Sequence, residues 1–290
     1  MDLYQTITDR IIAALETAPK GPGRPFWRGA TAASAIPFNL KTSARYRGVN
    51  TVNLWLTAQA CGYSSPAWLT FKQARELGGH VRRGEKATLG VFYASAEVVD
   101  EQAEGEDKRS HAFPIVRPFW VFNLDQIDGI ADAEEPSETF APIAAAEAVI
   151  AGSKARIIEG GTRAFYSPQD DEICLPERSR FISAEAFYGV ALHELTHWTG
   201  HPSRLNRDFS GRFGSEAYAF EELIAELGSA FLIADIGLVD ATLDGHASYV
   251  SSWLRILKND KRAVFTAASQ AVKAHEFLAR LLRKTEGRSD

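Results

Sequence analysis

Two histidines four residues apart, with a glutamate directly after the first, are the feature that most constrains how this chain of 290 residues can fold. They stand in the segment from His193 to His197 (HELTH). Residues four apart share one face of an α-helix, so both imidazoles can point at the same ion. The preceding residues, from Phe187 to Leu192, are largely apolar, which predicts a buried helix whose imidazole and carboxylate groups need partners. A core helix with two hydrogen-bonded histidines is the alternative.

This spacing is typical of a zinc site with an open coordination position. Zinc held by two neutral imidazoles and a third protein ligand keeps one position for water and makes that water more acidic. Glu194 can then take the proton of the water as it attacks a carbonyl, and can pass the proton to the leaving amine. We therefore predict a peptidase site that holds Zn²⁺ or another divalent metal such as Mn²⁺.

A third ligand is expected from a later helix, in which three carboxylates stand among apolar residues. Glu222 and Glu226 lie one turn apart and share a face. We predict that Glu222 binds the metal and that Glu226 orients a histidine through its free ring nitrogen, although the reverse assignment is open. Glu221 is expected to point elsewhere and to be solvated. A solvated acidic face is the alternative for all three, and His201 is a rival ligand, although the helix should end before it.

Peptidases of this type also need a donor that stabilises the oxyanion of the tetrahedral intermediate. His246 and Tyr249, three residues apart at the start of a following helix, are the candidates. A capping or core role is the alternative for both.

The chain is predicted to form two α+β domains, at residues 1–130 and 142–290, joined by a linker at 131–141 that gathers acidic residues and proline. The first should hold helices and a β-ribbon, and the second short strands and helices. The expected helices are 3–15 with Asp2 as N-cap, one from about Asn50, one from Pro66 to Gly78 with Ser65 as N-cap, 142–151, 183–199, 215–235, 246–258 and 260–283. The expected strands are 87–99 and 112–122 of the ribbon, 155–158, 163–166 and 172–175, the last being an edge strand that could pair with an extended substrate.

The charge of the chain is unevenly distributed. The whole chain carries a net charge of -5, yet residues 20–90 hold 11 Lys or Arg and only two acidic residues. Aromatic residues stand between these basic residues, and single-strand binders combine a positive groove with aromatic faces on which bases stack. Solvated basic loops and core aromatics are the alternative. The predicted DNA contacts are Arg24, Trp27, Arg28, Lys41, Arg45, Tyr46, Arg47, Lys72, Arg82, Arg83 and Lys86.

The composition also limits the cellular compartments in which the protein is expected to act. No stretch approaches the roughly 20 apolar residues of a membrane span, and the N-terminus lacks the pattern of a signal peptide. Cys61 and Cys174 are far apart in the chain and have no partner pattern, which fits a reducing compartment. We expect a cytoplasmic protein that has no membrane partner.

The combined motifs resemble the ArdC family of plasmid-borne antirestriction proteins. The segments that carry the resemblance are 46–50 (YRGVN), 68–74 (WLTFKQA), 78–86 (GGHVRRGEK), 193–200 (HELTHWTG), 204–208 (RLNRD) and 221–228 (EELIAELG). The first three look like the single-stranded-DNA-binding domain that this family shares with some conjugative primases. The last three are similar to its zincin-like metallopeptidase domain, which is related to Spartan-type DNA-dependent proteases.

The resemblance implies non-specific DNA binding that prefers single strands to duplexes, protection of incoming plasmid DNA during conjugation, and a metal at His193 and His197. Three hypotheses stay open at this point. The chain is a DNA-binding protein whose peptidase acts on proteins met on that DNA, or a DNA-coating protein with a structural metal, or a general intracellular metallopeptidase with an incidental basic surface.

Overall fold

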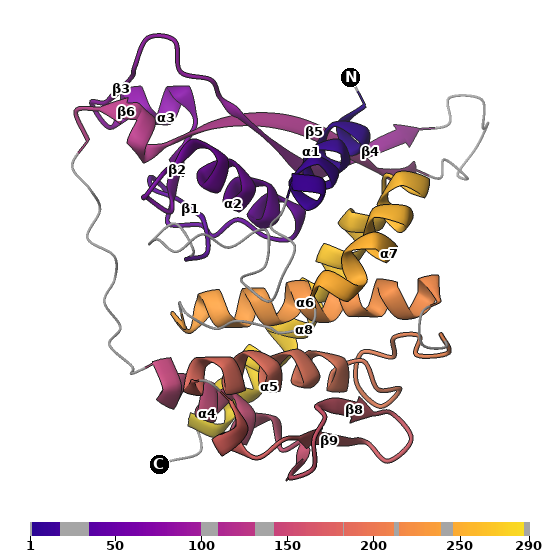
Figure 1. Cartoon of the computed structure of the whole chain (residues 1–290). Helices are drawn as coiled ribbons and strands as arrows, with labels where there is room; N and C mark the ends of the chain where they lie inside the picture. Colours follow the sequence, from indigo (N-terminus) through magenta and orange to yellow (C-terminus); the bar gives the residue numbers. More distant parts are fainter. Residues whose placement is uncertain are drawn as a thin grey trace.

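The computed structural model describes residues 2–17, 35–99, 110–130, 142–181, 183–211, 215–238 and 246–286. Its fold is α+β, as the sequence predicted, and we call the parts before and after residues 131–141 the N-terminal and C-terminal halves (Figure 1). None of the described helices combines the length and the apolar character of a membrane span. The N-terminal elements are α1 (Leu3–Thr17), β1 (Phe38–Asn39), α2 (Val49–Cys61), β2 (Ala67–Leu69), α3 (Phe71–Glu76), β3 (His80–Val81), β4 (Thr88–Val99), β5 (Ser110–Asn123), the 3₁₀ helix η2 (Leu124–Gln126) and β6 (Ile127–Asp128). The C-terminal elements are α4 (Pro142–Ser153), β7 (Arg156–Glu159), β8 (Phe165–Ser167), β9 (Glu172–Leu175), the 3₁₀ helix η3 (Arg178–Arg180), α5 (Ala184–Trp198), α6 (Glu216–Asp235), α7 (His246–Asn259) and α8 (Ala263–Glu286).

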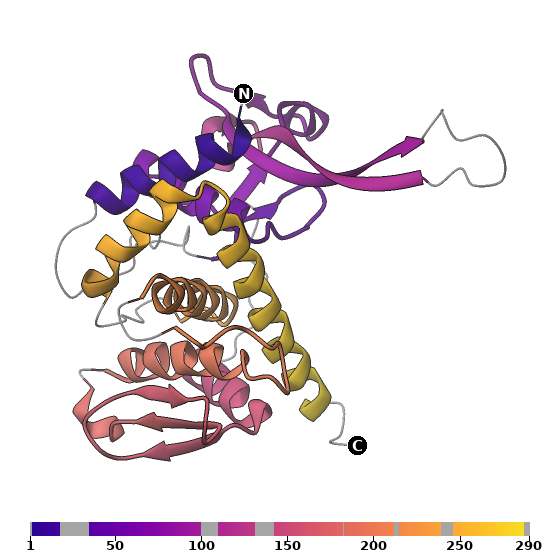
Figure 2. The ribbon, with the colours of Figure 1, turned by 90° about the vertical axis from the view of Figure 1, so that its right-hand side faces the viewer.

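The N-terminal half is built on a four-stranded sheet in the order β1-β2-β5-β4. Thr88–Val99 of β4 lies antiparallel to Ser110–Val121 of β5, which confirms the predicted ribbon. The ribbon projects away from the rest of the molecule (Figure 2). α2 packs against β4, where the Asn53 side chain donates a hydrogen bond of 2.7 Å to the backbone oxygen of Leu89.

Helix α1 forms where the apolar spacing predicted it. Ile7, Ile11 and Leu15 are buried on one face, because residues four apart stack along a helix. Asp2 caps the helix through a hydrogen bond of 3.1 Å that its carboxylate accepts from the backbone N–H of Gln5. This cap was also predicted.

The predicted helix start at Ser65 is wrong. The buried residues 67–69 form β2 between β1 and β5, and the helix that follows is the short α3. Its N-cap is Thr70, whose hydroxyl accepts a hydrogen bond from the backbone N–H of Gln73 at 3.2 Å while the Gln73 side chain accepts one from Thr70 at 2.9 Å. A serine followed by proline also suits a turn. Residues 67–69 pair with β1 and β5 as a strand and therefore do not form the first turn of a helix. The stop at Gly78 is confirmed by its positive φ of 83°.

In the C-terminal half α5 and α6 lie side by side, and the sheet β7-β9-β8 covers α5 (Figures 1 and 2). α8 packs along α6 and α4. The prediction that 172–175 is an edge strand is wrong, because β9 is the central strand, parallel to β7 and antiparallel to β8. β8 is therefore an edge of this sheet.

The largest apolar cluster contains residues of both halves. Ile7 and Ile11 of α1 and Trp55 of α2 belong to the same cluster as Phe231 of α6 and Trp253 of α7. The rings of Trp55 and Phe231 lie 5.9 Å apart between centroids. The two halves therefore share a core. Residues 131–141 lie outside the described part of the chain, so the division into domains at that segment stays a prediction.

Replacing Ile7 with alanine should lower the free energy of unfolding of the whole chain by about 2–5 kcal/mol, because it leaves a cavity in the shared core. Urea denaturation followed by tryptophan fluorescence measures the change. The matched control is Ile143→Ala on α4, where the side chain is 40% exposed and the cost should stay near 0.5 kcal/mol. Equal costs for the two variants would contradict a core shared by α1.

Candidate metal centre

Two helices bring three metal-binding side chains together. Nε2 of His193 lies 3.4 Å from one carboxylate oxygen of Glu222, and Nε2 of His197 lies 3.7 Å from the other. One ligand atom from each of these residues lies within 4.8 Å of the others, so one ion can reach all three. The predicted ligand set is thus gathered in one place, with both imidazoles on α5 and the carboxylate on α6.

Local sequence explains why these helices present their ligands so closely. Ser183 and Ser215 are N-caps as predicted, and each hydroxyl accepts a hydrogen bond of 3.2 Å from a backbone N–H in the first turn. Gly228 lies where α6 crosses Thr196 of α5, and a Cβ atom there would stand 2.5 Å from the Thr196 methyl group. Glycine at this position lets the two backbones approach, which sets the separation of the ligands.

The outer ring nitrogens of both histidines also face carboxylates. Nδ1 of His193 lies 3.7 Å from Glu226, which is longer than a hydrogen bond, so the orienting role of Glu226 stays a prediction. Nδ1 of His197 lies 3.0 Å from Glu221. The expectation that Glu221 is solvated is therefore wrong, since its side chain is only 8% exposed. Carboxylates in such positions fix the orientation of ligating histidines.

An arginine from the loop after α5 holds Glu221 in place. Arg207 is buried and donates hydrogen bonds of 2.9 and 2.8 Å to the two Glu221 oxygens. It also donates a hydrogen bond of 2.7 Å to the backbone oxygen of Thr196 in the last turn of the helix, and that oxygen accepts a second one from the Thr199 hydroxyl. Sequence reasoning assigned Arg207 no role at the site. The sequence feature that could have indicated this role is a basic residue shortly after the end of a helix, where arginine side chains commonly bind the last backbone carbonyls of the helix.

Glu194 lies beside the ligands, and its role as the general base stays a prediction. It is 8% exposed and lines the same cleft as His193 and His197. Burial raises the pKa of Glu194, although the nearby histidines and the backbone N–H of Tyr166 in β8 act in the opposite direction. The carboxylate therefore lies near the edge of the small sheet, in the cleft that Tyr166 also lines.

The metal-binding side chains open onto a cleft of about 810 Å³. Its walls come from β8, α5, α6, α7 and the loop after α5, and they are rich in aromatic rings. The aromatic residues that line it are Phe165, Tyr166, Phe181, Phe209, Tyr218, Tyr249 and Trp253. A cleft of this size at a candidate metal site is large enough to hold part of a peptide.

A pair of tyrosines closes one side of the ligand set. The hydroxyls of Tyr218 and Tyr249 lie 3.2 Å apart, and burial, Tyr249 and the carboxylate of Glu222 together raise the pKa of Tyr218. Tyr249 thus lies at the site as predicted, whereas the side chain of His246 lies outside the described part of the structure. Sequence reasoning missed Tyr218, although its place one turn before Glu222 puts both on one face of α6.

The charges of the site fit a bound cation. Glu194, Glu221, Glu222 and Glu226 are all less than 9% exposed, and Arg207 is the fixed cation that contacts this group among the described residues. Buried carboxylates in such excess need positive charge nearby. Burial alone would lower the pKa of His197, but its hydrogen bond to Glu221 and the adjacent carboxylate of Glu222 outweigh this and raise the pKa to about 10. The site therefore attracts positive charge, and its two imidazoles and carboxylate are donors that suit zinc or manganese.

Comparison with known proteins agrees with this geometry. Residues 1–122 match the family model of the N-terminal domain of anti-restriction factor ArdC, and residues 144–270 match a zincin-like metallopeptidase family. The chain is 41% identical to the crystallised antirestriction protein ArdC of plasmid R388, with a TM-score of 0.81 and coverage of 98% of this chain and 99% of that one. The chain belongs to the ArdC antirestriction family.

Other relatives of this ArdC-family protein include longer proteins. The uncharacterised protein y4eC of Sinorhizobium fredii is 41% identical over 93% of this chain and 89% of its own length. DNA primase TraC of Escherichia coli is 39% identical over 95% of this chain, which spans 27% of that primase. The R388 protein has also been crystallised with Mn(II) bound, and this second structure has a TM-score of 0.77 and covers 97% of this chain.

The predicted DNA contacts of this family member fall into separate groups. Arg24, Trp27 and Arg28 lie outside the described residues. Lys41 and Lys72 both pair with Glu76.

The turn after β3 carries a second group. Arg82 pairs with Glu85 at 3.1 Å and with Asp128 at 3.3 Å. Arg83 and Lys86 are exposed and have no ion pair among the described residues.

The third group follows β1, and its two arginines form ion pairs with residues of the C-terminal half. Arg45 pairs with Asp235, and Arg47 pairs with Glu276. The ring of Tyr46 stacks on Phe119 with the centroids 6.0 Å apart, so much of its surface is covered.

Replacing His193 with alanine should remove the bound metal, because one of the two nitrogen ligands is lost. Metal analysis of the purified protein by inductively coupled plasma mass spectrometry measures this. His201→Ala is the matched control, since His201 lies in the loop after α5 with Nδ1 2.8 Å from the Ser203 hydroxyl, and its loss should leave the metal content unchanged. A His193→Ala protein with the full metal content would rule out the ligand set.

Replacing Glu221 with glutamine should weaken metal binding by about 10–100-fold, which is the usual effect of losing a carboxylate that orients a ligating histidine. Competition with a chelator of known affinity measures the change. Glu216→Gln is the control on the same helix, where the side chain is 61% exposed. Equal affinities of the two variants would show that Glu221 does not support His197.

Proposed function

We propose that this ArdC-family protein binds single-stranded DNA without sequence preference and cleaves proteins that it meets on that DNA. In this way it protects incoming plasmid DNA from restriction during conjugation, and it acts in the cytoplasm. The observation that carries the peptidase part is the convergence of His193, His197 and Glu222 next to Glu194 at the base of an open cleft. Duplex DNA is expected to bind more weakly.

The residues of the cleft can take distinct parts in peptide hydrolysis. A divalent cation held by His193, His197 and Glu222 would supply Lewis-acid polarisation of a substrate carbonyl and of water. Glu194 takes the proton of the attacking water and passes it to the leaving amine. The hydroxyl of Tyr249, which lines the cleft beside Tyr218, can donate a hydrogen bond to the oxyanion.

The edge of the small sheet supports binding of an extended substrate. Phe165 and Tyr166 of β8 line the same cleft as His193 and Glu194, and the backbone N–H of Tyr166 lowers the pKa of Glu194. Both observations support an orientation in which the side of β8 away from β9 faces the metal-binding residues. No other strand among the described residues pairs with this side of β8. A peptide can add there as a further strand, which would place its backbone across the cleft. This assigns to β8 the role that was expected of β9.

The open cleft favours a catalytic metal over a purely structural one. Structural zinc sites commonly have four protein ligands, whereas catalytic sites keep a position for water or substrate. Among the described residues three side chains form the candidate ligand set. A DNA-coating protein with a structural metal would not need the adjacent Glu194 or a cleft of about 810 Å³. Holding the peptidase on DNA would raise the effective concentration of DNA-bound targets, which favours the proposal over a general peptidase.

Replacing Glu194 with glutamine should keep the metal and DNA binding but slow proteolysis by about 10²–10⁴-fold, because the general base is lost. Proteolysis is measured on labelled casein with and without single-stranded DNA, and protection is measured as mating efficiency into a restricting recipient. Glu177→Gln, at an exposed residue outside the cleft, is the control and should behave as the wild type. Full protection by Glu194→Gln would exclude proteolysis as the mechanism, and absence of DNA binding in the wild type would exclude the DNA part.

A further inference from the structure

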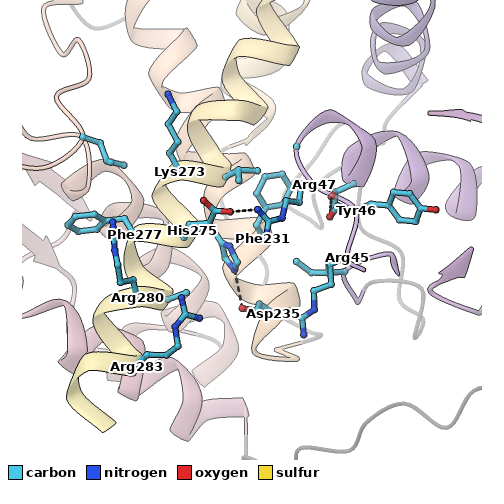
Figure 3. A pocket seen from close by; sticks show the side chains of 17 residues that line it. Arg45, Tyr46, Arg47, Phe231, Asp235, Lys273, His275, Phe277, Arg280 and Arg283 are labelled. Atoms are coloured by element: carbon cyan, nitrogen blue, oxygen red, sulfur yellow. Dashed lines mark hydrogen bonds and ion pairs between the residues drawn. The ribbon is translucent and has the colours of Figure 1, made fainter. Parts of the chain in front are cut away.

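A second pocket lies between the two halves, away from the metal centre. It has a volume of about 520 Å³ and we call it the seam pocket. The chain from Arg45 to Thr51, at the start of α2, forms one wall. The C-terminal end of α6, with Phe231 and Asp235, and the stretch of α8 from Val272 to Arg283 form the others (Figure 3).

The lining of this pocket is strongly basic. It contains five Arg or Lys side chains and a histidine, against the two carboxylates of Asp235 and Glu276. Asp235 pairs with Arg45 and lies 3.0 Å from Nε2 of His275, while Glu276 lies 2.7 Å from Arg47. Burial alone would raise the pKa of Asp235, but His275 and Arg45 lower it, so this carboxylate stays ionised. Both carboxylates are therefore already neutralised by cations of the pocket.

Three further cations line the pocket from α8 alone. Lys273, Arg280 and Arg283 are exposed, and within the described parts of the chain none of them forms an ion pair. Their spacing of seven and three residues places them along one side of the helix. Lys273 and Arg280 are about 10 Å apart along its axis. Figure 3 shows Arg280 and Arg283 on α8, across the pocket from Arg45 and Arg47.

We propose that the seam pocket binds phosphodiester groups of single-stranded DNA, held from one side by Arg45 and Arg47 and from the other by Lys273, Arg280 and Arg283 of α8. Guanidinium groups bind phosphate oxygens in pairs, and lysine adds a point charge. The inference rests on the proposed DNA binding and extends it, because it makes the C-terminal half part of the DNA-binding surface.

The aromatic residues of the pocket favour the sugar-phosphate backbone over a free nucleotide. Phe231 is 3% exposed and packs in the shared core. Phe277 lies under the guanidinium of Arg280, which stands 5.6 Å from its ring centre. The ring of Tyr46 points away from the pocket (Figure 3) and stacks on Phe119. No ring of the described lining therefore offers the free face on which a base would stack, so the pocket is suited to charge alone.

The position of the pocket links it to the peptidase site. α6 carries Phe231 and Asp235 toward its C-terminal end, and Glu222 lies about two and a half turns before Phe231 and about three and a half turns before Asp235. A strand held in the seam pocket would thus lie against the same helix that supplies the carboxylate ligand. This arrangement keeps a DNA-bound protein within reach of the cleft without a long tether.

The test is the triple variant Lys273→Gln, Arg280→Gln, Arg283→Gln, with its metal content and melting temperature checked against the wild type. A control variant, Lys154→Gln, Arg156→Gln, Arg180→Gln, removes the same number of lysines and arginines from the same half, at residues that do not line the pocket. Binding of a fluorescein-labelled oligodeoxythymidylate is followed by fluorescence anisotropy over a range of salt concentrations.

We expect the triple variant to bind at least about 10-fold more weakly at about 0.1 M salt, and its slope of log K against log salt to fall by about 2, since each phosphate contact contributes about 0.7 on a single strand. The control should keep the wild-type slope. Equal affinity and slope in the two variants would overturn the inference while leaving the proposed function intact, whereas a wild type that binds no DNA would overturn the proposed function itself. If inorganic phosphate raises the melting temperature of the wild type alone while DNA affinity is equal in both variants, the ligand is a free phosphate and the DNA assignment is wrong.

Discussion

The structure depends on a buried excess of negative charge between α5 and α6. Glu194, Glu221, Glu222 and Glu226 lie where water cannot solvate them freely, and such a group is stable only with positive charge in its midst. Arg207 neutralises Glu221 through an ion pair. The imidazoles of His193 and His197 lie next to the carboxylates of Glu222 and Glu226. A cation at the centre would complete the balance, so the same charges that are costly to bury also create the affinity for metal.

Much of this could be predicted from local patterns. The spacing of His193 and His197, the serine caps of α5 and α6, and the apolar period of α1 are determined by residues within one or two turns of each other. The ligand set of two imidazoles and Glu222 could be proposed because helix geometry fixes which residues share a face. The β-ribbon was predictable for the same reason, since alternation and β-branched content are local properties.

The remaining features depend on contacts between distant segments. Glu221 was expected to be solvated because its own helix places it off the Glu222 face, and only the loop that brings Arg207 to it makes it buried. The strand 172–175 has the pattern of any short strand, and its central place depends on β7 and β8. Ser65 and Pro66 form a helix-start signal that sheet completion overrode. Tyr218 could have been found from its one-turn spacing to Glu222, whereas the seam pocket could not, because its lining comes from parts of the chain that are far apart in sequence.

The core formed jointly by α1, α2, α6 and α7 has a consequence for how such proteins can be assembled by recombination. A fragment that ended between the halves would expose the faces of Trp55 and Phe231 that now cover each other, and exposed apolar faces of that size promote aggregation. Gene fusion can therefore transfer the N-terminal and C-terminal halves together more readily than either half alone. The resemblance of TraC to nearly the whole of this chain, inside a much longer primase, is what such joint inheritance would produce.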